Sequence, residues 1–269
     1  MSTVEAPPIT EGLRLEGISV RFGGHVAVDG LSLSAPLGRI TGLIGPNGAG
    51  KTTTFNACSG LQTVAAGHVY LNGEDVTGLG PAPRARRGLG RTFQRMELFD
   101  SMIVAGNVGA GREARLAGLN PLRHLWGSRS EGADTRRRLK DALERCELKD
   151  VAGTMVGELS TGRRRLVELA RVMCSGARML LLDEPSSGLD SSETKRFGAI
   201  LRSLVDDDGA GILLVEHDMT LVMGICDYLY VLDFGHLIFE GTPAEVHESP
   251  VVRAAYLGEL DADAVPGEA

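Results

Sequence analysis

The residues Gly45, Gly50, Lys51 and Thr52 fit the pattern G-x-x-x-x-G-K-[ST], which surrounds the phosphates of a nucleoside triphosphate. Glycines let the backbone approach the phosphates, and the amides at a helix N-terminus attract an anion. Lys51 would reach the β- and γ-phosphates, and the Thr52 hydroxyl would bind Mg²⁺. A glycine-rich structural turn is the alternative. The expected binding residues are Gly45, Pro46, Asn47, Gly48, Ala49, Gly50, Lys51, Thr52 and Thr53.

The segments on either side of this loop favour the nucleotide interpretation. Residues 40–44 form a short apolar run typical of a buried strand, and residues 51–59 are expected to form a short helix that stops at Gly60. A strand, a glycine-rich loop and a helix are the elements that position such a loop.

Two carboxylates follow a second apolar run at residues 179–182. An acid at the end of a parallel strand beside a phosphate loop can hold Mg²⁺, so we assign Asp183 to the metal. Consecutive strand residues point to opposite sides, so Glu184 is expected to act on the attacking water instead. A strand capped by solvated acids is the alternative.

A histidine follows a third apolar run, at residues 211–215. His217 could reach a γ-phosphate or order the catalytic Glu184, although a single histidine often has a structural role. Gln94 is a weaker signal: it lies where the strand-rich part gives way to helices, and Gln can ligate Mg²⁺ and orient water.

Ser160 is a good N-cap for a helix over residues 163–174. Arg163, Arg164 and Arg165 follow in the first turn, where positive charge opposes the helix dipole, so local helix stability does not explain them. We expect this exposed helix start to receive a phosphate from elsewhere.

Composition limits the function classes. The formal charge of -7 argues against broad nucleic-acid binding. Four widely spaced cysteines lack C-x-x-C spacing and indicate buried residues of a reducing compartment. We expect no signal peptide, and no apolar run approaches the roughly 20 residues that span a bilayer. A membrane role would therefore depend on another chain. The cysteines are Cys58, Cys146, Cys174 and Cys226.

The order of expected elements indicates an α/β fold. The first third is rich in strands, the middle in helices, and the last third alternates again, with a helix over 193–205 as a parallel crossover requires. Residues 109–129 show no clean period, so we expect an irregular insertion there. Strands are expected at 13–20, 31–34, 68–71, 228–233 and 237–240, and a further helix at 134–146.

Together these motifs resemble an ABC-type ATPase subunit, over about residues 13–257. The resemblance implies a P-loop NTPase core of ABC ATPase type, with an N-terminal antiparallel β portion and a helical subdomain. It implies one domain over residues 12–258, with its core at 12–94 and 176–258 and its helical subdomain at 95–175. Residues 1–11 and 259–269 are expected to be disordered.

The same resemblance implies roles for further residues. Phe22 would stack on adenine, and Asp190 would communicate across an interface with a second ATPase subunit. The segment Ser160, Thr161 and Gly162 would contact ATP held by that subunit, so two ATP molecules lie between two subunits. Thr52, Gln94 and Asp183 would bind Mg²⁺. Thr161 stands where the family usually has Gly or an aromatic residue, and Arg163 stands where it usually has Gln. That Gln is expected to contact the ribose, so the change to Arg163 affects this contact.

Within this family the chain is similar to uptake ATPases for branched-chain amino acids. The segments that carry this likeness are residues 91–94, 215–219, 222–225, 231–235 and 255–259. The resemblance implies a peripheral ATPase at the cytoplasmic face of the membrane, paired with a paralogue more often than with a copy. Two permeases and, indirectly, an extracytoplasmic binding protein would complete the importer. A urea or short-amide importer and a soluble non-transport ABC ATPase are the alternatives.

Overall fold

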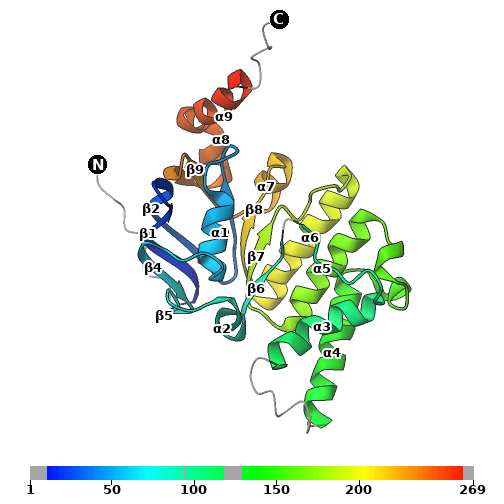
Figure 1. The fold of residues 1–269 in the computed structure, drawn as a ribbon. Helices are drawn as coiled ribbons and strands as arrows, with labels where there is room; N and C mark the ends of the chain where they lie inside the picture. The colour runs from blue at the N-terminus through cyan, green and yellow to red at the C-terminus, as the bar shows by residue number, and fades with distance from the viewer. Residues whose placement is uncertain (1–10, 94, 118–128, 263–269) are drawn as a thin grey trace, which may run out of the picture.

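The computed structural model describes residues 11–93, 95–117 and 129–262, which form two sheets and a set of helices (Figure 1). The larger sheet has the strand order β10-β9-β3-β8-β7-β6, in which β10 is antiparallel to β9 and the other neighbours are parallel. Its strands are β3 (Ile40–Ile44), β6 (Leu89–Arg91), β7 (Met179–Asp183), β8 (Gly211–Val215), β9 (Tyr228–Asp233) and β10 (His236–Gly241).

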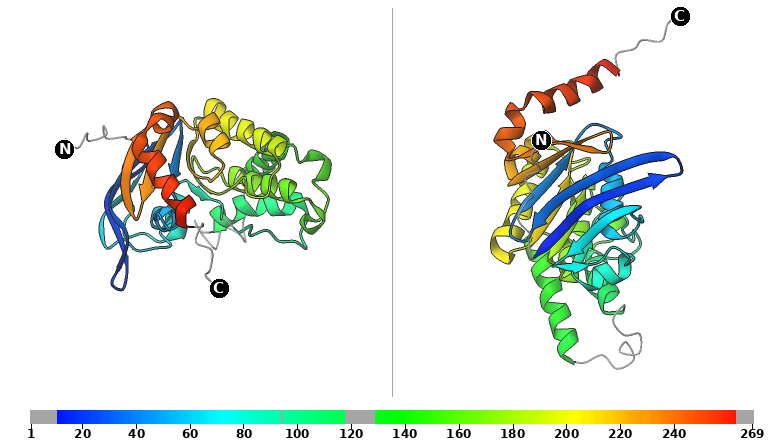
Figure 2. Two further views of the ribbon diagram at one scale, coloured as in Figure 1. Left: turned by 90° about the horizontal axis from the view of Figure 1, so that it is seen from above. Right: turned by 90° about the vertical axis from the view of Figure 1, so that its left-hand side faces the viewer.

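The smaller sheet is antiparallel, with the order β2-β1-β4-β5. Its long strands are visible in the right-hand view of Figure 2. Asn72 and Gly73 take φ angles of 50° and 78° between its last two strands, which is the tight turn expected from an Asn-Gly pair. The strands are β1 (Gly12–Phe22), β2 (His25–Pro36), β4 (Ala66–Leu71) and β5 (Glu74–Asp75).

Helices link the strands and form a separate region beside the larger sheet (Figure 1). The 3-10 helices η2 (Lys149–Val151) and η3 (Val156–Glu158) lie in the same region. The α-helices are α1 (Lys51–Ser59), α2 (Pro81–Arg86), α3 (Val104–Ala117), α4 (Arg129–Arg145), α5 (Thr161–Ser175), α6 (Ser191–Asp208), α7 (Met219–Ile225), α8 (Pro243–Glu248) and α9 (Pro250–Ala262).

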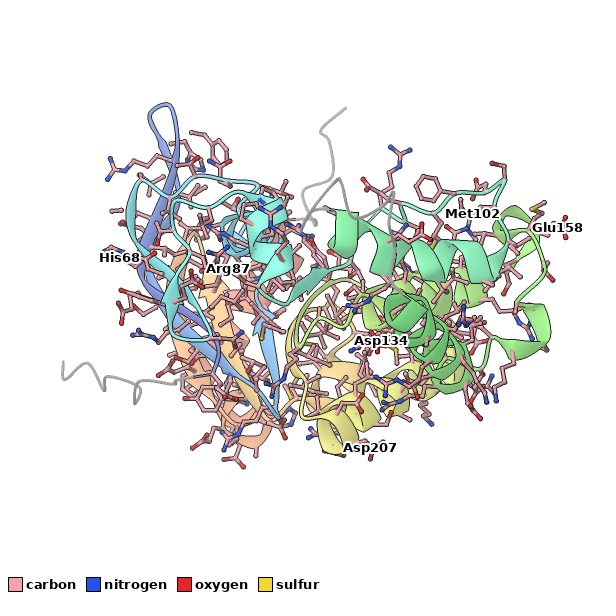
Figure 3. The ribbon with its side chains drawn as sticks, turned by 90° about the horizontal axis from the view of Figure 1, so that it is seen from below. His68, Arg87, Met102, Asp134, Glu158 and Asp207 are labelled. Carbon is pink, nitrogen blue, oxygen red and sulfur yellow. The ribbon has the colours of Figure 1, made fainter. Side chains whose placement is uncertain are left out.

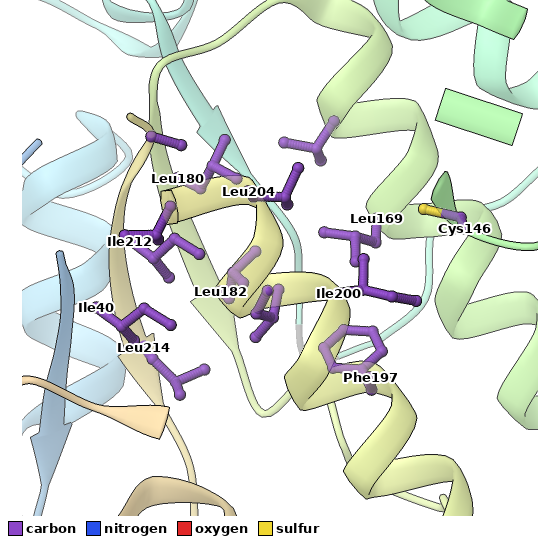
Figure 4. Packing of buried hydrophobic residues seen from close by; sticks show 14 of the residues in the cluster. Ile40, Cys146, Leu169, Leu180, Leu182, Phe197, Ile200, Leu204, Ile212 and Leu214 are labelled. Atoms are coloured by element: carbon purple, nitrogen blue, oxygen red, sulfur yellow. The ribbon is translucent and has the colours of Figure 1, made fainter. Parts of the chain in front are cut away.

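Each central strand of the larger sheet is buried on both faces, which explains its continuous apolar run. Leu180, Leu182, Ile212 and Leu214 face α5 and α6 (Figure 4). The alternate residues of β7 and β8 face the smaller sheet and α1 instead. The sheet therefore separates two cores and holds its strand ends in fixed positions.

A fully buried arginine fixes the C-terminal end of α1. Arg84 Nη1 donates to the carbonyl oxygens of Ala57 and Cys58, at 2.6 and 2.7 Å. Its Nε and Nη2 donate to Leu79 and Thr77 carbonyls at 2.8 and 3.1 Å. Burial lowers the pKa of Arg84, and the positive charge lies where the helix dipole is negative.

The expectation of an irregular insertion at residues 109–129 is wrong for its first part. Residues 109–117 belong to α3, and residues 118–128 lie outside the described chain. A Cβ on Gly111 would come within 2.0 Å of the Arg171 carbonyl oxygen. Glycine therefore permits close packing of α3 on α5, and this small-residue contact hides the helical period.

The expected disorder at the C-terminal end begins too early. Helix α9 continues to Ala262, so residues 259–262 are helical and only 263–269 lie outside the described chain. The Leu, Glu and Ala residues of that last turn are good helix formers. At the other end, Glu11 is described and its carboxylate lies 3.8 Å from Arg178, while residues 1–10 are outside.

The helices of residues 95–175 project away from the smaller sheet. Seen from below, His68 and Arg87 lie at one side of the molecule, whereas Met102 and Glu158 lie at the other (Figure 3). The amide of Val156 donates to the Met102 carbonyl at 3.1 Å, which ties η3 to the segment before α3. Among the described residues, no helix is both long and apolar enough to cross a membrane.

Candidate functional site

The glycine-rich loop connects the end of β3 to the start of α1, as expected. Gly45 has φ 148°, and a Cβ there would lie 2.1 Å from the Leu232 carbonyl oxygen. Gly50, the N-cap of α1, has φ 99°, and a Cβ there would lie 2.7 Å from the Ala27 carbonyl oxygen. Both positions need glycine because the loop packs directly on β9 and β2.

Lys51 is buried at the start of α1 and holds its ammonium over the loop. Its Nζ donates to the carbonyl oxygens of Gly45 and Pro46, at 2.5 and 2.8 Å. These bonds satisfy a charge that is costly to bury. They also keep the ammonium beside the amides at the helix start, where a phosphate would bind.

Asp183, the last residue of β7, is 2% exposed. Its Oδ2 lies 3.4 Å from Arg91 Nη2, and its Oδ1 has no hydrogen-bond partner. Burial raises the pKa of this carboxyl, while the Arg91 guanidinium and Lys51 lower it. An unsatisfied carboxylate oxygen beside the phosphate loop fits a magnesium ion.

The oxygen atoms near the loop suit a Mg²⁺ ion that phosphates and water also coordinate, and not a metal that the protein coordinates alone. Within the described ranges, no group of three or more His, Cys, Asp or Glu side chains could hold a metal. Mg²⁺ commonly binds one or two protein oxygens together with substrate phosphates and water. The exposed Thr52 hydroxyl and the Asp183 carboxylate are such oxygens. Gln94, the third expected ligand, lies outside the described residues.

Glu184 leaves the direction of β7 through a left-handed backbone, with φ 47°. Its amide donates to the Val215 carbonyl at 2.9 Å, and its Oε1 lies 2.9 Å from His217 Nε2. The two acids therefore differ because the chain turns at Glu184, not because both continue the strand. Strain of this kind often occurs where a side chain must face a ligand.

Glu216 is a buried carboxylate that the sequence interpretation passed over. It is 4% exposed; its Oε1 accepts from the Ser186 amide at 2.7 Å and its Oε2 from the His217 amide at 3.2 Å. Burial raises its pKa, which these amides oppose. Glu216 therefore ties the loop after Glu184 to the loop that carries His217. The sequence feature that could have indicated Glu216 is its position between a core strand and His217.

Most of the predicted nucleotide residues share one pocket of about 410 Å³. Phe22, half exposed at its mouth, and the loop residues line it together with Glu184 and His217. His25 and Ala27 add to the lining from β2 and were not predicted. The predicted residues in the lining are Phe22, Asn47, Gly48, Ala49, Gly50, Lys51, Thr52, Thr53, Glu184 and His217.

The predicted signature segment lies elsewhere. Ser160 is the N-cap of α5, with its hydroxyl accepting from the Arg163 amide at 3.4 Å. Ser160 and Gly162 line a pocket of about 150 Å³ that shares no residue with the first. A Cβ on Gly162 would lie 2.2 Å from Glu193 Oε1, so a larger residue there would have to displace the Glu193 carboxylate. Lys51 and Ser160 of one chain thus line different pockets.

Each of the three arginines after Ser160 pairs with a carboxylate, and the expected phosphate contact at this helix start stays a prediction. Arg163 pairs with Asp150 at 2.9 Å, and Arg164 with Asp100 at 2.6 Å. Arg165 is buried and pairs with Glu168 at 3.3 Å. Carboxylates on neighbouring segments, and Glu168 on α5 itself, therefore stabilise charges that the helix dipole alone would oppose.

Asp190 forms a capping box at the start of α6. Its Oδ1 accepts from the amides of Ser192 and Glu193 at 2.7 and 2.9 Å, and Glu193 Oε2 accepts from the Asp190 amide at 3.0 Å. The capping box accounts for an aspartate at position 190 within one subunit. The expected role of Asp190 at a subunit interface stays a prediction. All four cysteines are free and buried, as expected.

Comparisons with known proteins agree with this geometry. The family model described as ABC transporter matches residues 28–187, and a model described as branched-chain amino acid ATP-binding cassette transporter matches residues 236–262. A nucleotide-free ATP-binding cassette from an ABC transporter superposes with a TM-score of 0.79 at 31% identity, over 91% of this chain and 98% of that one.

Curated relatives extend the match to nearly the full length. The chain is 38% identical over 252 residues to the high-affinity branched-chain amino acid transport ATP-binding protein LivG of Escherichia coli K12, covering 92% of this chain and 98% of LivG. BraF of Pseudomonas aeruginosa, described in the same words, is 37% identical over 250 residues, with coverages of 92% and 98%. The lipopolysaccharide export ATP-binding protein LptB of E. coli is 32% identical over 247 residues, with coverages of 92% and 97%.

The fold and the phosphate pocket define an ATP-binding cassette, and the chain belongs to the ATP-binding proteins of ABC transporters. Within that family it is of the branched-chain amino-acid type. Its enzymatic class is therefore that of an ATPase whose hydrolysis is coupled to transport. The expected α/β cassette fold is confirmed.

Proposed function

We propose that this chain is the ATP-hydrolysing subunit of an importer for branched-chain amino acids. The observation that carries the proposal is the match of residues 236–262, which span β10, α8 and α9, to the branched-chain model. Overall identity alone discriminates less, because the export protein LptB is also 32% identical. The C-terminal segment favours the uptake class.

In the proposed mechanism, Lys51 and the loop amides bind the ATP phosphates at the start of α1. Thr52 and Asp183 would hold Mg²⁺, with Gln94 as a further proposed ligand. Bound Mg²⁺ would neutralise charge on the β- and γ-phosphates. Glu184 orients the attacking water, or takes its proton, for in-line attack at the γ-phosphate.

His217 and Glu216 support that step from the neighbouring strand. His217 Nε2 lies 2.9 Å from Glu184 Oε1 and so limits the rotamers of the carboxylate. Glu216 holds the His217 amide and the Ser186 amide, which fixes both loops. Phe22, at the pocket mouth, offers an apolar ring for the adenine.

A second ATPase subunit would complete each site. Since Ser160 and Lys51 line different pockets of one chain, Ser160, Thr161 and Gly162 would act on ATP held by the other subunit. We favour a paralogue as that partner. The assembly would lie at the cytoplasmic face of the membrane on two permeases, served by an extracytoplasmic binding protein, with ATP closing the pair and hydrolysis reopening it.

Uptake of labelled leucine by cells tests the cargo. Disruption of the chain should abolish saturable leucine uptake, and the intact chain should restore it. Labelled urea and a short amide are measured in parallel, and loss of either with leucine uptake intact would favour the alternative importers. Recovery of the chain from membranes with two permease chains is expected, whereas recovery without them would favour a non-transport ATPase.

A further inference from the structure

Glu168 is a charged residue in the middle of α5, and it is 2% exposed. A carboxylate is costly to bury unless it is paired and hydrogen-bonded. The apolar packing of this helix is provided by its neighbours Val167, Leu169 and Ala170, which are themselves buried. Core packing therefore does not account for a carboxylate at this position.

The contacts of Glu168 join three segments that are distant in sequence. Its Oε1 accepts from the amide of Phe93 at 3.4 Å, and its Oε2 lies 3.3 Å from Arg165 Nη1. Arg165, 5% exposed, donates through Nε to the Ser187 carbonyl at 3.4 Å. One buried ion pair thus connects α5 to the segment after β6 and to the loop after β7.

Each of these segments leads to a residue assigned to ATP. Phe93 directly precedes Gln94, Ser187 follows Glu184 by three positions, and Ser160 caps the start of α5. The contacts are at the long end of the hydrogen-bond range, so a small rotation of α5 relative to the larger sheet would break at least one. In a low-dielectric interior such a network has few satisfied arrangements.

We propose that Glu168, with Arg165, is a positioning residue that couples the orientation of α5 to the segment before Gln94 and to the loop after Glu184. Helix α5 is the helix that one subunit presents to the ATP of its partner. The pair would couple the position of this helix to the hydrolytic site of its own subunit. This inference rests on the proposed transport function. Because adjacency alone does not establish coupling, the test reads coupling directly.

The experiment uses the complete transporter in proteoliposomes, with ATPase activity measured with and without leucine-loaded binding protein. Wild type must first show stimulation, since its absence would contradict the proposed function rather than this inference. Glu168→Gln keeps the side-chain volume and removes the charge. We expect its ratio of stimulated to basal turnover to fall by about fivefold or more, the low end of ordinary allosteric coupling.

The KM for ATP should stay close to wild type, whereas the thermal midpoint should fall because the buried Arg165 loses its carboxylate partner. Glu168→Asp should retain part of the stimulation. The matched control is Glu74→Gln, which removes an exposed carboxylate on β5 paired with Arg87. An unchanged ratio in Glu168→Gln, or equal losses of basal and stimulated turnover, overturns the proposal. If Glu168→Gln does not assemble, Glu168→Asp replaces it in the test. A double variant, Glu168→Asp with Arg165→Lys, is then measured as well, and full stimulation of that double variant also overturns the proposal.

Discussion

His217 Nε2 lies 2.9 Å from Glu184 Oε1, and the two side chains come from loops that follow neighbouring strands of the larger sheet. Asp183 pairs in register with Val215, so the carboxyl ends of β7 and β8 are level. The sheet register therefore brings together two residues that are 33 positions apart in sequence. This contact places a histidine where it can control the direction of a carboxylate in the ATP pocket.

The Glu184→Gln variant tests the catalytic assignment. It keeps the shape of the side chain but removes its basicity, so ATP turnover should fall by about 10²- to 10⁴-fold. ATP binding should persist, because the loop and Lys51 are intact. Phosphate release and binding of a fluorescent ATP analogue measure the two quantities, with Glu74→Gln as control. Full turnover in Glu184→Gln would exclude Glu184 as the base.

Arg91→Ala tests the buried ion pair beneath the proposed metal site. The guanidinium lies 3.4 Å from Asp183, and the two side chains are 9% and 2% exposed. Its removal leaves a buried carboxylate without its cation, which costs about 3–5 kcal/mol. Urea unfolding measures the loss. The control is Arg87→Ala, whose exposed pair with Glu74 should change the midpoint little. Equal shifts for both variants would contradict the assignment.

Two glycines of the phosphate loop should respond differently to alanine. In Gly45→Ala the new Cβ would meet the Leu232 carbonyl oxygen at 2.1 Å, at φ 148°. We expect this variant to lose ATP binding, with or without loss of the fold. In Gly48→Ala the Cβ enters open space at φ 78°, so only backbone strain of about 1–2 kcal/mol is expected. Urea unfolding and ATP binding of the two variants measure this difference, and equally mild effects would show that the loop can move away from β9.

The buried cysteines predict how stability depends on alkaline pH. Burial raises the pKa of the Cys58 thiol from 9.0 to about 12. Between these values the unfolded chain releases a proton that the folded chain keeps, so stability falls as pH rises above about 9 and is unaffected below it. The slope is about 1.4 kcal/mol per pH unit for each such thiol.

Urea midpoints at several pH values, compared between wild type and Cys58→Ala, isolate this contribution. The variant should show a shallower decline above pH 9 and no difference in slope near neutrality. Native protein should also resist thiol reagents near neutral pH, while urea-unfolded protein reacts at all four cysteines. Parallel declines in the two proteins would mean that Cys58 is ionised in the folded state.

Much of the fold was predictable because local signals agreed with tertiary structure. Strand 40–44 and helix 51–59 were predicted with the observed bounds, since an apolar run and a glycine-rich loop define them locally. The helical character of residues 109–117 was missed because small residues allow α3 to pack closely on α5. Helix packing of that kind leaves no clear hydrophobic period in the sequence.

Most of the pocket residues were predicted, while their supporting residues were not. Glu216 and Glu168 look like ordinary surface residues in a sequence, and their partners come from distant segments. Likewise, nothing next to Arg163 in the sequence indicates its ion pair with Asp150, 13 positions away. Contacts that depend on the whole fold cannot be deduced from spacing.

Arg84 has a consequence for how this chain can vary. Its guanidinium donates to the four carbonyls of Thr77, Leu79, Ala57 and Cys58, and lysine has neither the planar fork nor the number of donors to replace it. Arg87, three residues further along, pairs with the exposed Glu74 on β5 and donates to the Pro83 carbonyl at the surface. In a library of all single substitutions, position 84 should therefore tolerate almost none and position 87 should tolerate many. The sequence alone does not distinguish these two arginines.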